Sequence, residues 1–228
     1  MTTNKQELDS WFNELYNSAM EAVGRGWNLI PISIASKKPL VEWKKYQTEL
    51  ITLETVDDWF ENGVPTEYGQ RVKPFNLALV TGAISGVVVV DCDNEEATLY
   101  AMNHNIKSPF SVKTTRGRPY YFAHPRNGQR FGNKVGNNSH DWPEQDGLDF
   151  RGDGGYVLMP PSMKYKDGEI VHKYEWEIGV GLGLDDLEDF EWVGSPTEVE
   201  ARVEGEFSFG SLNLSGVSIV GSEDGAPI

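Results

Sequence analysis

The sequence contains a single cysteine, Cys92, and only four histidines among its 228 residues. One cysteine cannot form an internal disulfide. So few cysteines and histidines, scattered along the chain, also exclude a structural zinc site of the usual Cys/His spacing. We therefore expect no zinc, and any metal bound by this chain must be held by oxygen ligands.

The chain also lacks a long apolar run and a recognisable targeting segment. No stretch is long enough to span a bilayer. The N-terminal MTTNKQELDSWFNEL has neither a basic segment followed by an apolar one nor an Arg- and Ser-rich transit pattern. Hydrophobic residues nevertheless make up 39%, and seven Trp, nine Tyr and ten Phe are too many for a disordered chain. We expect a globular, cytoplasmic protein with no membrane partner.

Basic residues are outnumbered, giving a net charge of -15, but the charge is unevenly spread. From Glu175 to the end there are thirteen acidic residues and one basic residue, so the preceding 174 residues carry 19 basic against 22 acidic. Residues 105–140 contain no Asp or Glu, and such a basic block can face nucleic-acid phosphates. The cations of this block that we expect to bind DNA are Lys107, Arg126, Arg130 and Lys134.

Hydrophobic periodicity predicts an α+β fold. Helices are expected at 5–23, 52–61 and 95–103. Strands are expected at 28–33, 76–80, 87–90, 110–114, 119–123, 147–151, 155–159 and 172–177, with 76–80 and 87–90 paired as a hairpin across TGAISG. Residues 1–193 are predicted to form the folded domain, and 194–228 to be an acidic, Gly- and Ser-rich linker or tail.

Two carboxylates follow a run of valines in VVVVDCD, residues 87–93. Side chains alternate along a strand, so Asp91 and Asp93 emerge on one face and Cys92 on the other, where it is expected to be a buried core residue. Two like charges in one space favour a hard cation such as Mg²⁺ or Mn²⁺ between them. The alternative is that an Asp caps the following helix near Asn94.

A third carboxylate lies within GLDFRGDGGYVLMPPS, residues 147–162. Asp149 sits in an apolar strand, where a carboxylate needs a compensating charge, and it is a candidate third ligand for one or two metal ions. Arg151 shares its strand face and is either its salt-bridge partner or a phosphate contact. Gly154 and Gly155 either admit a ligand close to the backbone or form a hairpin turn.

The segment VKTTRGRPYYFAHP, residues 112–125, alternates cations with aromatics. It predicts a basic hairpin with Arg116 and Arg118 at its tip. That composition suits a triphosphate or a nucleic-acid backbone, with Tyr120 or Phe122 stacked on a base or sugar. Alternatively, the aromatic residues belong to the core on one face of the hairpin.

In this order, the three motifs resemble the bifunctional primase-polymerase (prim-pol) domain of the archaeo-eukaryotic primase superfamily, found in replication proteins of phages and plasmids. The resemblance covers roughly residues 15–180, because GWNLIPIS, KKPLVEWKKYQ and NLALVTG also fit the family's N-terminal portion. It implies an α+β catalytic domain with mixed or antiparallel sheets flanked by helices, occupying residues 1–193. Family members commonly continue into a helicase, to which residues 194–228 would connect.

The resemblance also implies an activity, which is template-directed transfer of nucleotides to a 3′-hydroxyl on single-stranded or primed DNA, with priming as a second activity. It implies that Asp91, Asp93 and Asp149 bind two catalytic Mg²⁺ or Mn²⁺ ions. The nucleoside triphosphate would meet the basic hairpin and the third motif, through Lys113, Thr114, Arg116, Arg118, Tyr120, Arg151, Gly154 and Gly155.

One element departs from the family pattern. A histidine usually precedes the aromatic-Tyr-Phe run and contacts the phosphates, whereas this sequence has Pro119 there. His124 lies five residues further on, and strand alternation places it on the opposite face. Two competing functions stay open at this point, namely a metal-dependent nuclease using the same acids and a single-strand-binding module with weakened catalysis.

Overall fold

A computed structural model describes residues 5–66, 69–125, 128, 130–136 and 141–191. All of them belong to one compact unit, Met1–Trp192. The predicted tail at 194–228 and the predicted DNA contact Arg126 lie outside the described residues.

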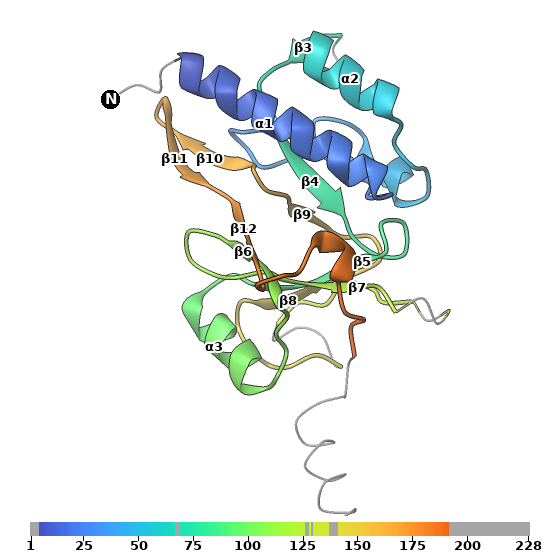
Figure 1. Ribbon diagram of the computed structural model, residues 1–228, viewed down its shortest axis with the longest axis vertical. Coiled ribbons are helices and arrows are strands. Elements are labelled where there is room, and N and C mark those ends of the chain that lie inside the picture. Colours follow the sequence, from blue (N-terminus) through green and yellow to red (C-terminus); the bar gives the residue numbers. More distant parts are fainter. Residues whose placement is uncertain (1–4, 67–68, 126–127, 129, 137–140, 192–228) are drawn as a thin grey trace, which may run out of the picture. The chain divides into compact units, whose positions relative to one another are not determined.

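The N-terminal part consists of two helices packed on a three-stranded antiparallel sheet (Figure 1). The helices are α1 (Lys5–Gly24) and α2 (Leu53–Asn62). The strand order is β1 (Leu29–Ile32), β4 (Asn76–Val80) and β9 (Tyr156–Leu158). The i, i+4 stripe of α1 buries Trp11, Leu15 and Ala19 completely, as expected for an amphipathic helix covering a sheet.

The second part is a five-stranded antiparallel sheet with α3 (Glu95–Asn103) against it. Its strand order is β12 (Glu175–Ile178), β6 (Phe110–Lys113), β7 (Tyr120–Ala123), β5 (Val87–Cys92) and β8 (Leu148–Arg151). Val87 and Val89 face the large core shared with the three-stranded sheet, whereas Val88 and Val90 face a smaller core under α3. Because both faces of β5 are covered, its sequence is a continuous apolar run.

Short elements complete the described fold. β2 (Val64–Pro65) pairs with β3 (Arg71–Val72), and β10 (Met163–Lys166) pairs with β11 (Glu169–Lys173). Two 3₁₀ helices are η1 (Trp43–Gln47) and η2 (Leu184–Asp186). The strand expected at 172–177 is divided between β11 and β12, because the chain leaves the β10–β11 hairpin at Tyr174, whose N–H donates to the Ser162 carbonyl.

The predicted hairpin of 76–80 with 87–90 is wrong. β4 lies between β1 and β9, and β5 lies between β7 and β8, so the two strands belong to different sheets. The TGAISG loop carries the chain from one sheet to the other through Gly82 and Gly86, whose φ angles are 99° and 67°. Both strands are buried on both faces, so their apolar runs say nothing about which strand is the partner.

Candidate active site

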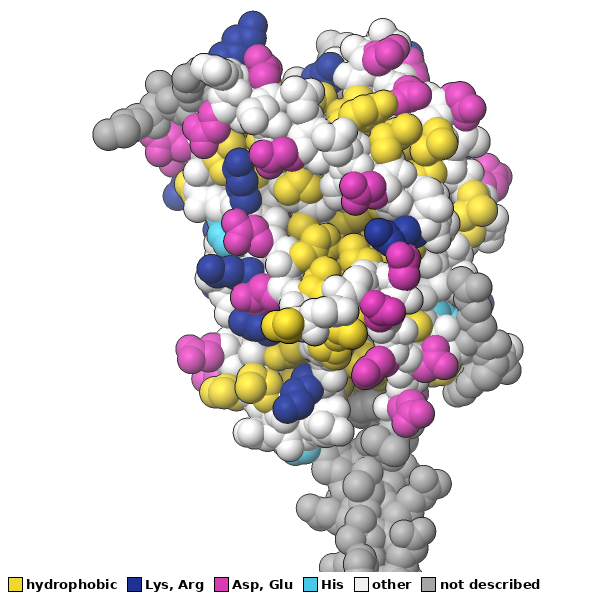
Figure 2. All heavy atoms as spheres, viewed as in Figure 1, with side chains coloured by type: hydrophobic (Ala, Val, Ile, Leu, Met, Phe, Trp, Pro, Cys, Tyr) yellow, Lys and Arg dark blue, Asp and Glu magenta, His cyan; other side chains and the backbone are white. Residues whose placement is uncertain are grey.

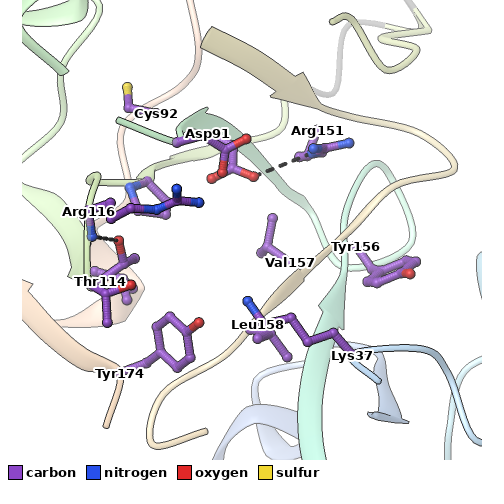
Figure 3. A pocket seen from close by; sticks show the side chains of 14 residues that line it. Lys37, Asp91, Cys92, Thr114, Arg116, Arg151, Tyr156, Val157, Leu158 and Tyr174 are labelled. Carbon is purple, nitrogen blue, oxygen red and sulfur yellow. Dashed lines mark hydrogen bonds and ion pairs between the residues drawn. The ribbon is translucent and has the colours of Figure 1, made fainter. Parts of the chain in front are cut away.

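The DxD motif lies at the end of β5, between the two sheets. Asp91 continues the face of Val87 and Val89, and its side chain points into a pocket that Asp93 also lines (Figure 3). Cys92 points the other way, into the smaller core. Burial raises the pKa of the Cys92 thiol to about 12, which keeps the thiol protonated. The predicted alternation of the two carboxylates is confirmed.

The helix-cap alternative is wrong for both aspartates. α3 is capped by Asn94, whose side-chain oxygen accepts the Ala97 N–H at 2.7 Å. The backbone N–H of Asp93 donates to the Gly147 carbonyl at 2.8 Å, which fixes the chain after β5 and leaves the Asp93 carboxylate at the pocket. Neither carboxylate is therefore needed to begin the helix.

Asp149 lies directly opposite Asp91 in the β5–β8 ladder. Residues opposite each other in an antiparallel pair share a face, which brings two distant parts of the sequence together. The carboxylate of Asp149 is buried and accepts two hydrogen bonds, from the Gly136 N–H at 3.1 Å and from the Arg151 guanidinium at 2.7 Å. The Arg151 Nε also lies 3.5 Å from Asp91, a contact drawn in Figure 3. Arg151 is therefore a salt-bridge partner to both acids.

Negative charge is crowded at this site. Burial, followed by the charge of Asp93, raises the pKa of Asp91 to about 6, against the opposing effect of Arg151. Burial and the charge of Asp149 also raise the pKa of Asp93, against the opposing charges of Arg151, Arg116 and Lys37. A cation placed between the carboxylates would relieve this repulsion.

The carboxylates of Asp91, Asp93 and Asp149 are the candidate ligands for a divalent cation. Carboxylate oxygens are the ligands that Mg²⁺ and Mn²⁺ take. Asp91 and Asp93 line the pocket, and Asp149 lies opposite Asp91 in the ladder without lining it. Within the described ranges, however, no three His, Cys, Asp or Glu side chains are already grouped as a metal cage. The carboxylate of Asp149 is instead engaged by the Arg151 guanidinium. The residues fit such an ion chemically, with Asp91 and Asp93 open to the pocket.

The pocket itself is a cavity of about 240 Å³ between β5, β9 and the β6–β7 turn. Cations lie close to its acids, because Lys37 and Arg116 both line it. Tyr156 and Tyr174 add aromatic surface, and burial raises the pKa of Tyr174, so its hydroxyl remains protonated. In Figure 3 the carboxylate of Asp91 and the side chains of Arg116 and Lys37 surround one space.

The β6–β7 turn is fastened to the end of β5. Thr114 Oγ1 accepts the Gly117 N–H at 3.0 Å and donates to the Gly117 carbonyl at 2.7 Å. The Arg118 N–H donates to the Cys92 carbonyl at 3.0 Å. Gly117 packs so closely that a Cβ there would lie 1.7 Å from that carbonyl oxygen. This contact places Arg116 beside the carboxylates.

Of the residues expected to bind nucleotide, the structure brings Thr114, Arg116 and Arg151 to the pocket. It does not bring the other five there. Arg118 forms an ion pair with Glu177 at 2.8 Å, and Tyr120 is buried in the smaller core. The remaining three are Lys113, exposed on β6, Gly155, packed against Asn133 and Thr81, and Gly154, which lines a second cavity.

Three of the four residues expected to bind DNA are described by the structure. Lys107 and Arg130 are exposed, whereas Lys134 forms an ion pair with Asp141. Asp and Glu side chains are spread over the face of the molecule seen in Figure 1, as Figure 2 shows. Lys and Arg side chains lie among them on the same face.

Sequence reasoning missed Lys37 and the two tyrosines of the pocket. Lys37 occupies a turn after β1, with φ at 58° and its N–H donating to the Ser33 carbonyl at 3.0 Å. A non-glycine residue at positive φ is uncommon and often marks a functional position. The available signal was the pair of lysines in KKPLVEW, but nothing local connects that stretch with residues 91–93.

A family model described as "Bifunctional DNA primase/polymerase, N-terminal" matches residues 19–188, from within α1 to just after the 3₁₀ helix η2. The chain belongs to this family. The matched range contains the DxD strand, the basic turn and Asp149, so the site described above lies wholly within the prim-pol domain. No curated protein matches the chain.

Membership of the prim-pol family establishes the general class of activity. The chain is a nucleotidyltransferase-type enzyme of DNA replication, with DNA and nucleotides as its substrates. The α+β fold and the predicted family are both confirmed. In the part of the chain that the structure covers, no helix has the length and hydrophobicity needed to cross a membrane.

Proposed function

We propose that this prim-pol domain is a template-directed DNA polymerase that extends a primed 3′-hydroxyl, using Asp91, Asp93 and Asp149 as its metal-binding carboxylates. The observation that supports this most is the cross-strand pair of Asp91 and Asp149, with Asp93 beside them and two cations across the same pocket. Acids alone suit several hydrolytic reactions. Acids facing unpaired cations suit a substrate that brings both metal ions and phosphates.

Asp91 and Asp93, together with Asp149, would hold Mg²⁺ or Mn²⁺. Two such ions, when bound, lower the pKa of an attacking hydroxyl and offset the charge of a leaving pyrophosphate. The task of the protein is to keep three carboxylates in one place. It does so through the β5–β8 ladder, through the Gly136 N–H and through Arg151, which offsets their repulsion.

Arg116 and Lys37 would bind the triphosphate, with Thr114 holding the turn that carries Arg116. In this assignment, Arg116 and Lys37 take over the phosphate contact of the histidine that the family usually has at the position of Pro119. Pro119 lines the pocket but has no polar side chain that could bind a phosphate. A guanidinium donates several hydrogen bonds in a fixed fork and can replace an imidazole at phosphate oxygens. Tyr156 is fixed by an edge contact with Trp43, with ring centroids 5.0 Å apart, and presents an aromatic surface to sugar or base.

Extension of a primer is proposed as the principal activity and priming as the second. Priming places two free nucleotides side by side, whereas the cavity at Asp91 measures about 240 Å³. A primer supplies its 3′-hydroxyl on a strand held by many contacts, so less binding energy is needed from this pocket. We therefore expect initiation to be slower than extension.

The test is extension of a labelled primer on a DNA template with each nucleotide type, in Mg²⁺ and in Mn²⁺. Asp91→Asn and Asp93→Asn should abolish extension in both metals. Asp58→Asn is the matched control, since Asp58 lies on α2 in an ion pair with Arg71. If the Asp91 and Asp93 variants extend as well as the parent protein, the proposed site is wrong. Shortening of the strand in Mg²⁺ without nucleotides would identify a nuclease instead.

A further inference from the structure

A second cavity, of about 650 Å³, lies at the opposite end of β5 from Asp91. There Val87 pairs with Ala123, and the His124 N–H donates to the Gly86 carbonyl at 2.9 Å. The cavity is lined by the β4–β5 loop, by the end of η1 and by the β8–β9 connection at Asp153. Its volume is in the range of small-molecule sites. No described residue lines both this cavity and the pocket at Asp91.

The imidazole of His124 lines this cavity without a hydrogen-bond partner. Its side chain is only 4% exposed, and neither ring nitrogen has a partner among the described residues. The acidic group closest to it is Asp153, whose Oδ1 lies 3.8 Å from Nε2, beyond hydrogen-bond distance. A buried polar group without a hydrogen-bond partner costs about 1–3 kcal/mol of stability. A ligand atom that formed a hydrogen bond with this ring would remove that cost, which favours binding.

Asp153 is held in place beside the histidine. Its two carboxylate oxygens accept the N–H groups of Ala83 and Phe131, each at 2.9 Å. Gly82 packs against it so closely that a Cβ would lie 2.7 Å from the Asp153 Cα. A carboxylate has about four acceptor positions, so Asp153 keeps capacity for donors from the cavity.

The lining has the chemistry of a nucleotide site. His124, Asp153 and the Gln47 amide offer donors and acceptors that suit the edge of a base, and Ile84 offers apolar contact for its face. Arg130 is the single cation among the described lining residues, and it is exposed. One cation matches the single charge of a phosphodiester and not the several charges of a triphosphate.

We propose that this cavity binds one nucleotide of the single-stranded template, a proposal that rests on the proposed function. The β8–β9 connection links the two sites, because Gly154 lines this cavity and Tyr156 lines the pocket at Asp91. Asp91 lies four positions after Val87 along β5, on the order of 13 Å at the usual strand rise. One strand of DNA can therefore reach both sites.

The experiment measures binding of a fluorescein-labelled single-stranded oligonucleotide by anisotropy, at fixed salt, without divalent ions or nucleotides. Ala83→Trp should fill the cavity and weaken binding about 10-fold, and His124→Phe, which removes only the ring nitrogens, should weaken it about 3-fold. Leu99→Trp is the matched control, because Leu99 is 51% exposed on α3, away from the cavity. Unchanged binding in both cavity variants would overturn the proposal.

Two further arms separate the remaining outcomes. The imidazole signals of His124, assigned with His124→Phe, should shift in NMR spectra when a tetranucleotide is added, and unmoved signals would overturn the proposal. If deoxyadenosine monophosphate alone binds and Ala83→Trp abolishes that binding, the site takes free nucleotides, which would overturn the template assignment. The polymerase proposal is read from primer extension, whereas this proposal is read from oligonucleotide binding without divalent ions or nucleotides, so failure of one is distinguishable from failure of the other.

Discussion

The two ends of β5 differ in how their buried polar groups are paired. At Asp91 the charges of Asp93 and Asp149 are close enough to act on its carboxylate, and the Arg151 guanidinium contacts both Asp91 and Asp149. At the other end the His124 imidazole is buried with no hydrogen-bond partner among the described residues, although the fixed carboxylate of Asp153 lies nearby. The end at Asp91 has an excess of negative charge, which favours the binding of cations. The end at His124 has an imidazole without a hydrogen-bond partner, which favours a neutral or singly charged group that can form hydrogen bonds. The two sites that we propose at the ends of this strand therefore differ in kind.

The largest effect on activity is expected when one of the carboxylates at the Asp91 end of β5 is removed. Asp91→Asn keeps the shape of the side chain but removes charge where divalent ions would bind, so primer extension should fall at least about 100-fold. Steady-state extension in Mg²⁺ and Mn²⁺ measures it. A loss smaller than ten-fold would mean that the excess charge at this end of β5 has no catalytic role.

The second largest effect is expected where the β6–β7 turn contacts the end of β5. Gly117→Ala places a Cβ against the Cys92 carbonyl, so the turn must move and carry Arg116 away from the acids. We expect KM for the nucleotide to rise about 10-fold, with a loss of roughly 1–3 kcal/mol in the free energy of unfolding. Gly24→Ala is the control, since a Cβ there meets nothing within 4 Å. Normal kinetics in Gly117→Ala would show that Arg116 does not depend on this contact.

The crowding of charge also predicts a pH-dependent stability. The pKa of Asp91 is about 6 in the folded protein, above the ordinary value of 3.8. The folded state therefore binds this proton more tightly, and the associated stability is present below pH ~4 and is lost as the pH rises through about 6. Asp91→Asn should accordingly stabilise the metal-free protein by about 1–3 kcal/mol at pH 8.

Urea unfolding of the metal-free protein between pH 4 and 8 measures this difference. The gain in Asp91→Asn should shrink as the pH falls from about 6 towards 4. Asp58→Asn should bring no such gain, because the pKa of Asp58 is lowered by its hydrogen bond with Arg71. A gain that is independent of pH would point to packing and not to charge.

The smallest effect is expected at Lys37. Lys37→Asn removes the cation but keeps a residue that tolerates positive φ, so the turn should survive. KM for the nucleotide should rise about 3-fold with little change in kcat, since one of two cations remains. Lys38→Asn, at the neighbouring exposed lysine, controls for general charge. Equal effects at both positions would remove Lys37 from the site.

Sequence reasoning succeeded where the information was local. Strand alternation placed Asp91 and Asp93 on one face and Cys92 in the core, and the three predicted helices all formed. It also identified Asp149 as a residue in need of compensation, which Arg151 supplies two positions away.

Contacts between distant segments were beyond its reach. The hairpin of β4 with β5 failed because two apolar strands covered on both faces carry no mark of their partners. Lys37 and the partnerless state of His124 escaped for the same reason, since each depends on segments far apart in the chain. Arg118 does not line the pocket but forms an ion pair with Glu177 on β12. The sequence does not reveal that β12 lies beside β6 in the sheet, so this pairing could not be predicted.

The guanidinium of Arg151 has a consequence for how the protein is made. Small metal-dependent domains often remain unfolded until their ion arrives, because their ligands repel one another or lack partners without it. Here an internal cation already lies between Asp91 and Asp149. We therefore predict that newly synthesised chains reach the native fold in the presence of a chelator. Under the proposed metal-dependent reaction, a shortage of divalent ions would then leave a folded but inactive enzyme.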